Sequence, residues 1–222
     1  GAHFKCLTRK PIPDPLTYPV NKDIYRTTVL LTTWERTMRG TIHSARLELV
    51  EGDITQQKDD AIVNAANTTL LGGGGVDGAI HRAGGPAILE ECKKIGGCPT
   101  GEAVITSGGN LPAQWVIHTV GPVWRDGSKR EDALLRNDYK NCLIQADLQQ
   151  LESIAFPSIS TGAYRFPIEK AAHIALSTIA GHLKGKTTVK TVYFVLFGAA
   201  ALEAYQNSLQ DLCGKDTEMK QV

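Results

Sequence analysis

The residues best suited to chemistry surround a run of four glycines, Gly72 to Gly75. The run follows a short apolar segment, residues 61–65, and leads to Asp77. Glycines cost conformational entropy, about 0.5–1 kcal/mol each relative to alanine, so a compact domain keeps four in succession where the backbone needs positive φ or approaches a ligand closely. Backbone N–H groups between a strand and a helix N-terminus converge on an anion. Residues 59–81 contain no Lys or Arg, so we expect backbone dipoles to hold a diphosphate here; the alternative is a plain turn without a ligand.

Asp77 is the residue that we expect to carry the chemistry. A carboxylate at the mouth of an anion site can position or deprotonate a water molecule, or hydrogen-bond the hydroxyl groups of a ribose. Asp is also a preferred N-cap residue, so Asp77 could begin the helix that follows. We interpret His81, one helical turn further on, as a packed residue behind the site, and His118, inside an apolar strand, as structural.

Other chemistries are disfavoured. A P-loop continues with Gly-Lys-Ser/Thr, whereas Val76-Asp77-Gly78 follows these glycines, and a dinucleotide motif opens a long helix, whereas Gly84-Gly85-Pro86 ends this one. No Ser-His-Asp or Cys-His nucleophile set is evident. The cysteines include no CxxC pair and no histidine at ligand spacing, which indicates thiols in a reducing compartment rather than a metal site or a disulfide framework. We therefore expect no metal and no cofactor. The five cysteines are Cys6, Cys92, Cys98, Cys142 and Cys213.

The overall composition is that of a globular protein without a nucleic acid partner. The formal net charge is +1, so no general excess of positive charge attracts phosphates. Residues 1–45 carry a net excess of positive charge, with seven Lys/Arg against three acids. The longest uncharged apolar run, residues 192–202, is shorter than the ~20 residues of a membrane helix. We expect a monomer inside the cell, cytoplasmic or nuclear, with an organellar address left open.

The elements that must position these residues alternate between strands and helices. Apolar stripes at spacings of three and four predict helices over 130–150, 167–183 and 199–212, besides a short helix that begins near Asp77. The alternation predicts an α/β sheet covered by helices on both faces. Four prolines in residues 1–19 predict an extended lead-in, and residues 21–38 could form a short helix or strand. Short apolar runs predict strands at 46–51, 61–65, 102–106, 115–120, 153–156 and 189–197.

Five motifs, in their order along the chain, resemble the macrodomain family and its MacroD-type ADP-ribose hydrolase branch. The resemblance covers about residues 45–213 and implies a three-layer α/β/α fold with a mixed central sheet. Residues 1–44 would then be an N-terminal extension, 45–213 the macrodomain and 214–222 a C-terminal tail. The motifs are Gly52-Asp53-Ile54-Thr55, Asn64-Ala65-Ala66-Asn67, the glycine loop with Val76 to His81, His118-Thr119-Val120-Gly121-Pro122, and Ser160-Thr161-Gly162-Ala163-Tyr164.

The resemblance also implies which residues bind ADP-ribose. Several have structural alternatives: Asp53 could cap a turn, Asn64 and Asn67 could form turns with left-handed backbone, Tyr164 could pack in its loop, and Phe197 could be a core residue. Two departures affect this assignment: Gly198 to Ala201 follow Phe197 where the family often has an acid, and Arg165 follows Tyr164 where glycine is common. The implied contacts are Asp53, Ile54 and Phe197 for the adenine; Ala65, Ala66, Asn67 and Tyr164 for the distal ribose; and Gly73, Gly74, Gly75, Val76, Ser160, Thr161, Gly162 and Ala163 for the two phosphates.

The activity that the resemblance implies is hydrolysis of an ester between the distal ribose and an acyl group. The substrates would be proteins carrying mono-ADP-ribose on Asp or Glu, or O-acetyl-ADP-ribose. A water held by Asp77 and Asn67 would attack, and much of the acceleration would come from positioning. The alternative is a reader module that binds ADP-ribose without turnover. A poly-ADP-ribose glycohydrolase is disfavoured, because that branch has paired glutamates where this chain has His81-Arg82.

Overall fold

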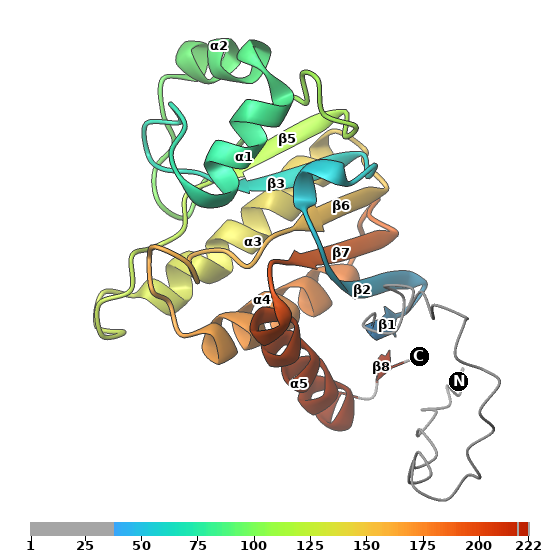
Figure 1. Ribbon diagram of the computed structural model, residues 1–222. Helices are drawn as coiled ribbons and strands as arrows, with labels where there is room; N and C mark the ends of the chain where they lie inside the picture. The colour runs from blue at the N-terminus through green and yellow to red at the C-terminus, as the bar shows by residue number, and fades with distance from the viewer. Residues whose placement is uncertain (1–37, 217, 222) are drawn as a thin grey trace, which may run out of the picture.

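The computed structural model describes residues 38–216 and 218–221, and an eight-stranded sheet runs through their centre (Figure 1). The strands are β1 (Met38–Ile42), β2 (Ala45–Glu51), β3 (Ala61–Ala65), β4 (Ala103–Ser107), β5 (Trp115–Thr119), β6 (Ser153–Phe156), β7 (Thr191–Leu196) and β8 (Met219–Gln221). They lie in the order β4-β5-β3-β6-β7-β2-β1-β8. The five central strands are parallel, whereas β4, β1 and β8 pair antiparallel at the two sides. The predicted mixed α/β sheet is therefore confirmed.

Helices cover both faces of this sheet and complete three layers (Figure 1). They are η3 (Ile54–Gln56), α1 (Gly75–Gly84), α2 (Pro86–Ile95), α3 (Glu131–Leu148), α4 (Ile168–Leu183) and α5 (Ala199–Lys215). Helices α3, α4 and α5 bury residues such as Tyr139, Leu176 and Leu209 in one hydrophobic cluster. Ile54 of η3, Ile80 of α1 and Ile88 of α2 belong to a second cluster. None of the helices in the described ranges is long and apolar enough to span a bilayer.

Strand β3 shows why the sequence folds in this way. Successive side chains of a strand point to opposite faces of its sheet. Accordingly, Ala61 and Val63 pack in the cluster with α3, α4 and α5, whereas Ile62 packs in the cluster with α1 and α2. A strand with both faces covered is apolar on both, which explains the run of three apolar residues that begins β3, Ala61 to Val63.

The parallel strands determine where a site can form. Their carboxyl ends meet at one edge of the sheet, so the segments that follow β2, β3, β5, β6 and β7 gather there. Backbone hydrogen bonds connect these segments: Gly52 N–H donates to the Leu196 carbonyl (3.1 Å), and Ala66 N–H donates to the Thr119 carbonyl (2.9 Å). In open α/β sheets, ligands bind at this edge. The motifs singled out in the sequence all lie at or next to it.

The boundaries of the strands and helices agree with the sequence prediction in most places. The six predicted strands end within two residues of the observed ones. Helix α2 was not predicted, because Gly85-Pro86 indicated the end of a helix, whereas Pro86 in fact begins a new one at a position that suits proline. The predicted lead-in 1–19 and the predicted element 21–38 lie outside the described residues, apart from Met38.

The folded unit extends beyond the predicted macrodomain range at both ends. Strand β1 pairs with β2 through a tight antiparallel hairpin, and β8 pairs with β1. Residues 38–42 and 219–221 therefore pair into the same sheet as the strands of the predicted macrodomain range. Both strands are short, and β1 contains a glycine, so neither has the apolar pattern that marks the central strands.

Candidate active site

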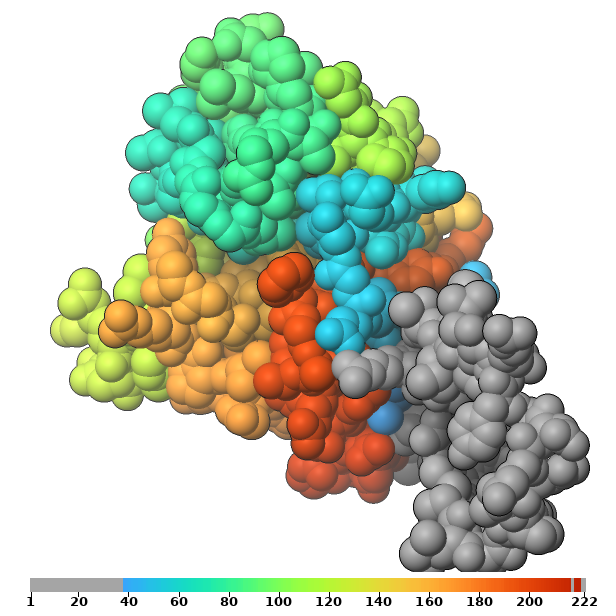
Figure 2. Space-filling model, in the orientation of Figure 1, coloured from blue at the N-terminus to red at the C-terminus, as the bar shows by residue number. Residues whose placement is uncertain are grey.

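The glycine loop joins β3 to α1 at the carboxyl edge of the sheet. Gly72 and Gly75 have positive φ, +84° and +59°, a conformation that other residues rarely adopt. Helix α1 begins at Gly75 with Gly74 as its N-cap, so the N–H groups of its first turn lack intrahelical partners. Gly73 to Gly75 are exposed. In Figure 2, this segment lies next to the orange and red segments that follow β6 and β7. The loop thus has the strand–glycine–helix arrangement of an anion site.

Asp77 occupies the third position of α1 and points into the protein. It is 4% exposed, and its Oδ1 accepts a hydrogen bond of 2.7 Å from Asn64 Nδ2. The predicted alternative of an N-cap is wrong, because the helix begins two residues earlier at Gly75. Asp77 Oδ2 is buried without a hydrogen-bond partner among the described residues. Leaving a buried carboxylate oxygen without a hydrogen bond costs free energy, so we expect a water or ligand to donate a hydrogen bond to this oxygen.

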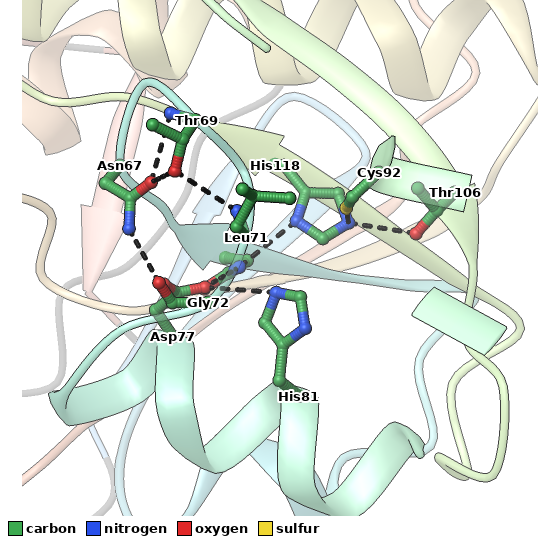
Figure 3. Close-up of polar contacts among 10 residues, drawn as sticks. Asn67, Thr69, Leu71, Gly72, Asp77, His81, Cys92, Thr106 and His118 are labelled. Carbon is green, nitrogen blue, oxygen red and sulfur yellow. Dashed lines mark hydrogen bonds and ion pairs between the residues drawn. The ribbon is translucent and has the colours of Figure 1, made fainter. Parts of the chain in front are cut away.

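Gly73 separates Asp77 from Asn67 and keeps the space between them open. A Cβ atom on Gly73 would lie 3.0 Å from Asp77 Oδ2 and 3.3 Å from Asn67 Nδ2. The two residues predicted to be catalytic therefore lie on either side of one glycine. Asp77, Asn67 and Gly72 are drawn together in Figure 3.

The amide of Asn67 also closes the loop in which it lies. Its Nδ2 donates to the Gly72 carbonyl (2.8 Å), and its Oδ1 accepts from the Thr69 backbone (3.1 Å) and hydroxyl (2.6 Å). This is the turn-forming role that the sequence left open, although neither Asn64 nor Asn67 has positive φ. A contact of Asn67 with substrate would add to this role.

A chain of buried polar groups lies behind Asp77. Asn64 on β3 is the register partner of His118 on β5, and Asn64 Nδ2 lies 3.1 Å from His118 Nδ1. On the other side of the ring, His118 Nε2 lies 2.9 Å from Thr106 Oγ1. Since the Thr106 hydroxyl donates to the Ser107 carbonyl, it accepts from His118, which places the imidazole proton on Nε2. Figure 3 shows this chain leading to Asp77.

His118 is held neutral by its surroundings. It is fully buried, and this burial, together with the neighbouring His81, lowers its pKa to about 3. A neutral imidazole can accept from Asn64 at Nδ1, which an imidazolium cannot. Sequence reasoning interpreted His118 as structural and gave Asn64 no place behind Asp77. The signal was a polar residue inside each of two apolar strands, and the strand register makes them partners.

His81 lies beside Asp77 rather than at the mouth of the loop. Its Nε2 lies 3.4 Å from Asp77 Oδ1, and this nitrogen has no hydrogen-bond partner in the described ranges. Its ring packs under Gly72, where a Cβ atom would lie 3.7 Å from the imidazole. His81 is thus a close neighbour of Asp77 behind the glycine loop.

The second loop, which follows β6, is also built for close approach. Ser160 is buried with a φ of +65°, and Gly121 packs so closely that a Cβ there would lie 2.1 Å from Ser160 Oγ. Thr161 Oγ1 donates to Ser158 Oγ (2.9 Å), while Gly162 and Ala163 are exposed. The exposed small residues of this second loop therefore lie at the same edge of the sheet as the glycine loop.

Tyr164 and Arg165 lie at the end of this second loop. Tyr164 is half-buried, and its carbonyl accepts from Trp124 N–H (2.9 Å), so the segments after β5 and β6 are bound together. Arg165, the predicted departure from the family pattern, has a φ of +58° and is exposed. Glycine adopts that conformation without strain, which explains why glycine suits this position.

The segments after β2 and β7 lie side by side. Asp53 is exposed and caps η3, since its Oδ1 accepts from the Thr55 backbone (2.9 Å) and hydroxyl (2.8 Å). The capping role that the sequence allowed is therefore present. Phe197 is 93% exposed, so the alternative of a core phenylalanine is wrong. Ile54 and Ala66 are buried at the same edge, and Ala65 is half-buried.

Comparison with known proteins identifies the family. The model of the Macro domain matches residues 63–175. A macro domain-containing protein of Caldanaerobacter subterraneus is 54% identical over 171 residues, which are 75% of this chain and 97% of that protein. A protein of Escherichia fergusonii named O-acetyl-ADP-ribose deacetylase is 52% identical over 169 residues, covering 74% of this chain and 96% of the relative.

Solved structures show the same fold. The Oceanobacillus iheyensis macrodomain with ADP is 46% identical, covers 81% of this chain and 97% of its own, and superposes with a TM-score of 0.78. The Trypanosoma brucei macrodomain in complex with ADP-ribose is 42% identical, with a TM-score of 0.68 over 72% of this chain and 68% of its own. On the sequence match, the three-layer fold and the glycine loop at the sheet edge, this chain belongs to the macrodomain family.

Proposed function

We propose that this protein is a hydrolase that cleaves the ester between ADP-ribose and an acyl group. Its substrates are O-acetyl-ADP-ribose and proteins that carry mono-ADP-ribose on Asp or Glu side chains. Relatives that are about 52% identical are named O-acetyl-ADP-ribose deacetylases, which supports this assignment. The observation that carries it is the buried, unpartnered Oδ2 of Asp77 beside Gly73, at the N-terminus of α1.

In this proposal, the two loops hold the diphosphate. The backbone N–H groups of Gly73 to Val76 bind one phosphate at the helix N-terminus, where the dipole of α1 favours negative charge. The small residues Ser160 to Ala163 bind the other. Asp53, Ile54 and the exposed ring of Phe197 enclose the adenine, while Ala65, Ala66 and Tyr164 line the distal ribose. Burying a bare aromatic side chain would favour binding by about 1.5–3 kcal/mol.

Asp77 and Asn67 then act on the ester. Asp77 Oδ2 accepts a hydrogen bond from a water and takes its proton as the water oxygen attacks the acyl carbon. The bond between the acyl carbon and the ribose oxygen breaks, and that oxygen receives the proton. The products are ADP-ribose and a carboxylic acid. Asn67 orients the water or a ribose hydroxyl through its amide, and the fixed diphosphate keeps the ester next to Asp77.

The test compares the wild type with Asp77→Ala in the release of acetate and ADP-ribose from O-acetyl-ADP-ribose. ADP-ribose binding is measured by calorimetry on the same samples. We expect turnover to fall strongly in Asp77→Ala while affinity stays within about tenfold, ~1.4 kcal/mol. Asp211→Ala, which removes a carboxylate that is 72% exposed on α5, is the matched control. Tight binding without release by the wild type would make the protein a reader module instead.

A further inference from the structure

Three potential metal ligands meet behind Asp77, although they are far apart in the sequence. They are His81 from α1, Cys92 from α2 and His118 from β5, and their ligand atoms all lie within 4.8 Å of one another. Thiolate sulfur and imidazole nitrogen are the ligand types that zinc binds in proteins. Figure 3 shows the Cys92 sulfur next to the His118 ring and the His81 ring beside Asp77.

The spacing of these atoms is close to what a metal requires. Cys92 Sγ lies 3.9 Å from His118 Nε2. Zn–S and Zn–N bonds of about 2.3 Å and 2.0–2.1 Å place donor atoms roughly 3.3–3.6 Å apart at a tetrahedral centre. Side-chain movements that shorten these separations by at most about 1.5 Å therefore suffice to bring the three donors onto one ion.

Two further observations favour a cation here. His81 Nε2 is buried without a hydrogen-bond partner in the described part of the chain, so no hydrogen bond must be broken to engage it. The Asp77 carboxylate lies 3.4 Å from this nitrogen and supplies a negative charge next to the site. Together with a Cys92 thiolate, it would balance the charge of a divalent ion.

We propose that His81, Cys92 and His118 form a binding site for a thiophilic divalent cation such as Zn²⁺, and that its occupation inhibits the hydrolase. The first part stands on the geometry of the cluster, whereas the second part rests on the proposed function. On binding, the Cys92 thiol gives its proton to solvent, and no residue is oxidised or reduced.

The inhibition follows from the proton on His118. A metal needs the lone pair of Nε2, so the proton must move to Nδ1. There it would meet the Asn64 amide nitrogen, which is itself a donor. The conflict is relieved when Asn64 rotates its amide, which turns Oδ1 toward the Asp77 carboxylate and replaces their hydrogen bond by repulsion. Occupation of the cluster thereby displaces the Asp77 carboxylate from its hydrogen bond with Asn64.

Binding is tested on the full chain without ADP-ribose, because a diphosphate itself binds metals. The protein is titrated with Cd²⁺, and the ultraviolet absorption of the cadmium–thiolate bond is recorded. We expect one Cd²⁺ per chain in the wild type and in Cys98→Ser, which removes another buried thiol outside the cluster. Cys92→Ser should lose the signal while retaining wild-type ADP-ribose affinity and cooperative unfolding. A signal that persists in Cys92→Ser, or its absence from the wild type, would overturn the site.

Inhibition is tested separately with Zn²⁺ in the deacetylase assay. Wild type and Cys98→Ser should lose at least about tenfold in turnover and recover it with a chelator, whereas Cys92→Ser should keep its turnover. Equal inhibition of all three proteins would contradict inhibition through this cluster. If the wild type has no hydrolase activity, the proposed function fails, but the cadmium titration still decides whether the metal site exists.

Discussion

At the scale of single residues, the site is organised by hydrogen-bond direction. Asp77 receives its hydrogen bond from Asn64, and the same amide nitrogen also lies within hydrogen-bond distance of His118. Because the pKa of His118 is lowered to about 3, this imidazole stays an acceptor at Nδ1 throughout the neutral range. The amide orientation of Asn64 is fixed by two acceptors, and Asp77 is fixed in turn.

Replacing Asn64 by alanine tests this arrangement. The change leaves the Asp77 carboxylate and His118 Nδ1 without a donor, so we expect turnover to fall by about tenfold or more while ADP-ribose affinity changes less than about threefold. Loss of two buried hydrogen bonds should also cost ~1–3 kcal/mol of stability. Initial rates, calorimetry and urea unfolding measure the three effects. Asn207→Ala on the exposed side of α5 is the control; a drop in affinity as large as the drop in turnover would refute a positioning role for Asn64.

Sequence reasoning identified Asp77 but not the residues behind it, for a physical reason. Asp77 follows a glycine run, and that local pattern is visible in one dimension. Asn64 and His118 acquire their roles from the parallel register of β3 and β5, which places them opposite each other. No spacing along the chain encodes that register. The sequence likewise indicated that Cys92 is one of several half-buried thiols in a reducing compartment, and only the packing of α2 places it next to His118.

At the scale of elements, the glycine loop and α1 act as one unit. Gly73 keeps the space between Asp77 and Asn67 open, and the N-cap at Gly74 aims the first turn of the helix at the same space. Strands β3 and β6 were predicted with their observed bounds because each is a short, mostly apolar run between turn residues. Helix α2 was not predicted, because Gly84-Gly85-Pro86 indicates the end of one helix more readily than the start of another.

Substituting Gly73 by alanine should therefore impair the site rather than the fold. The added Cβ lies 3.0 Å from Asp77 Oδ2, where we expect the attacking water, and 3.3 Å from Asn67 Nδ2. We expect turnover to fall by at least about tenfold, with a change in stability below about 1 kcal/mol. Gly181→Ala, in the exposed face of α4 with open space around it, serves as the control and should be stabilising by about 0.5–1 kcal/mol. Unaltered turnover in Gly73→Ala would place the reaction away from Asp77.

At the scale of the whole molecule, the sheet edge brings together segments from across the chain, and a buried acid lies beneath it. Asp138 on α3 is fully buried, and burial raises its pKa to about 8. The Thr119 hydroxyl lies 2.8 Å from the Glu102 carbonyl and 2.9 Å from Asp138 Oδ1. With its single hydrogen given to the carbonyl, Thr119 is left to accept from protonated Asp138. The Thr119 carbonyl in turn accepts from Ala66 at the end of β3.

This acid makes the stability of the fold depend on pH. In the unfolded chain Asp138 titrates near its ordinary value of 3.8, whereas in the fold it keeps its proton to about pH 8. Between these values the folded state binds one proton more, so the contribution of Asp138 to stability falls as pH rises, by at most about 1.4 kcal/mol per pH unit. Asp138→Asn keeps a neutral donor for Thr119 and removes the titration. The free energy of unfolding in urea is measured at several pH values between about 5 and 8. The difference in this free energy between Asp138→Asn and the wild type should shift in favour of the variant as pH rises, whereas the difference for Asp211→Asn should not change. The difference in unfolding free energy between Asp138→Asn and the wild type could instead stay constant over this range. That result would mean that Asp138 is ionised in the fold, and that water reaches the base of the sheet edge.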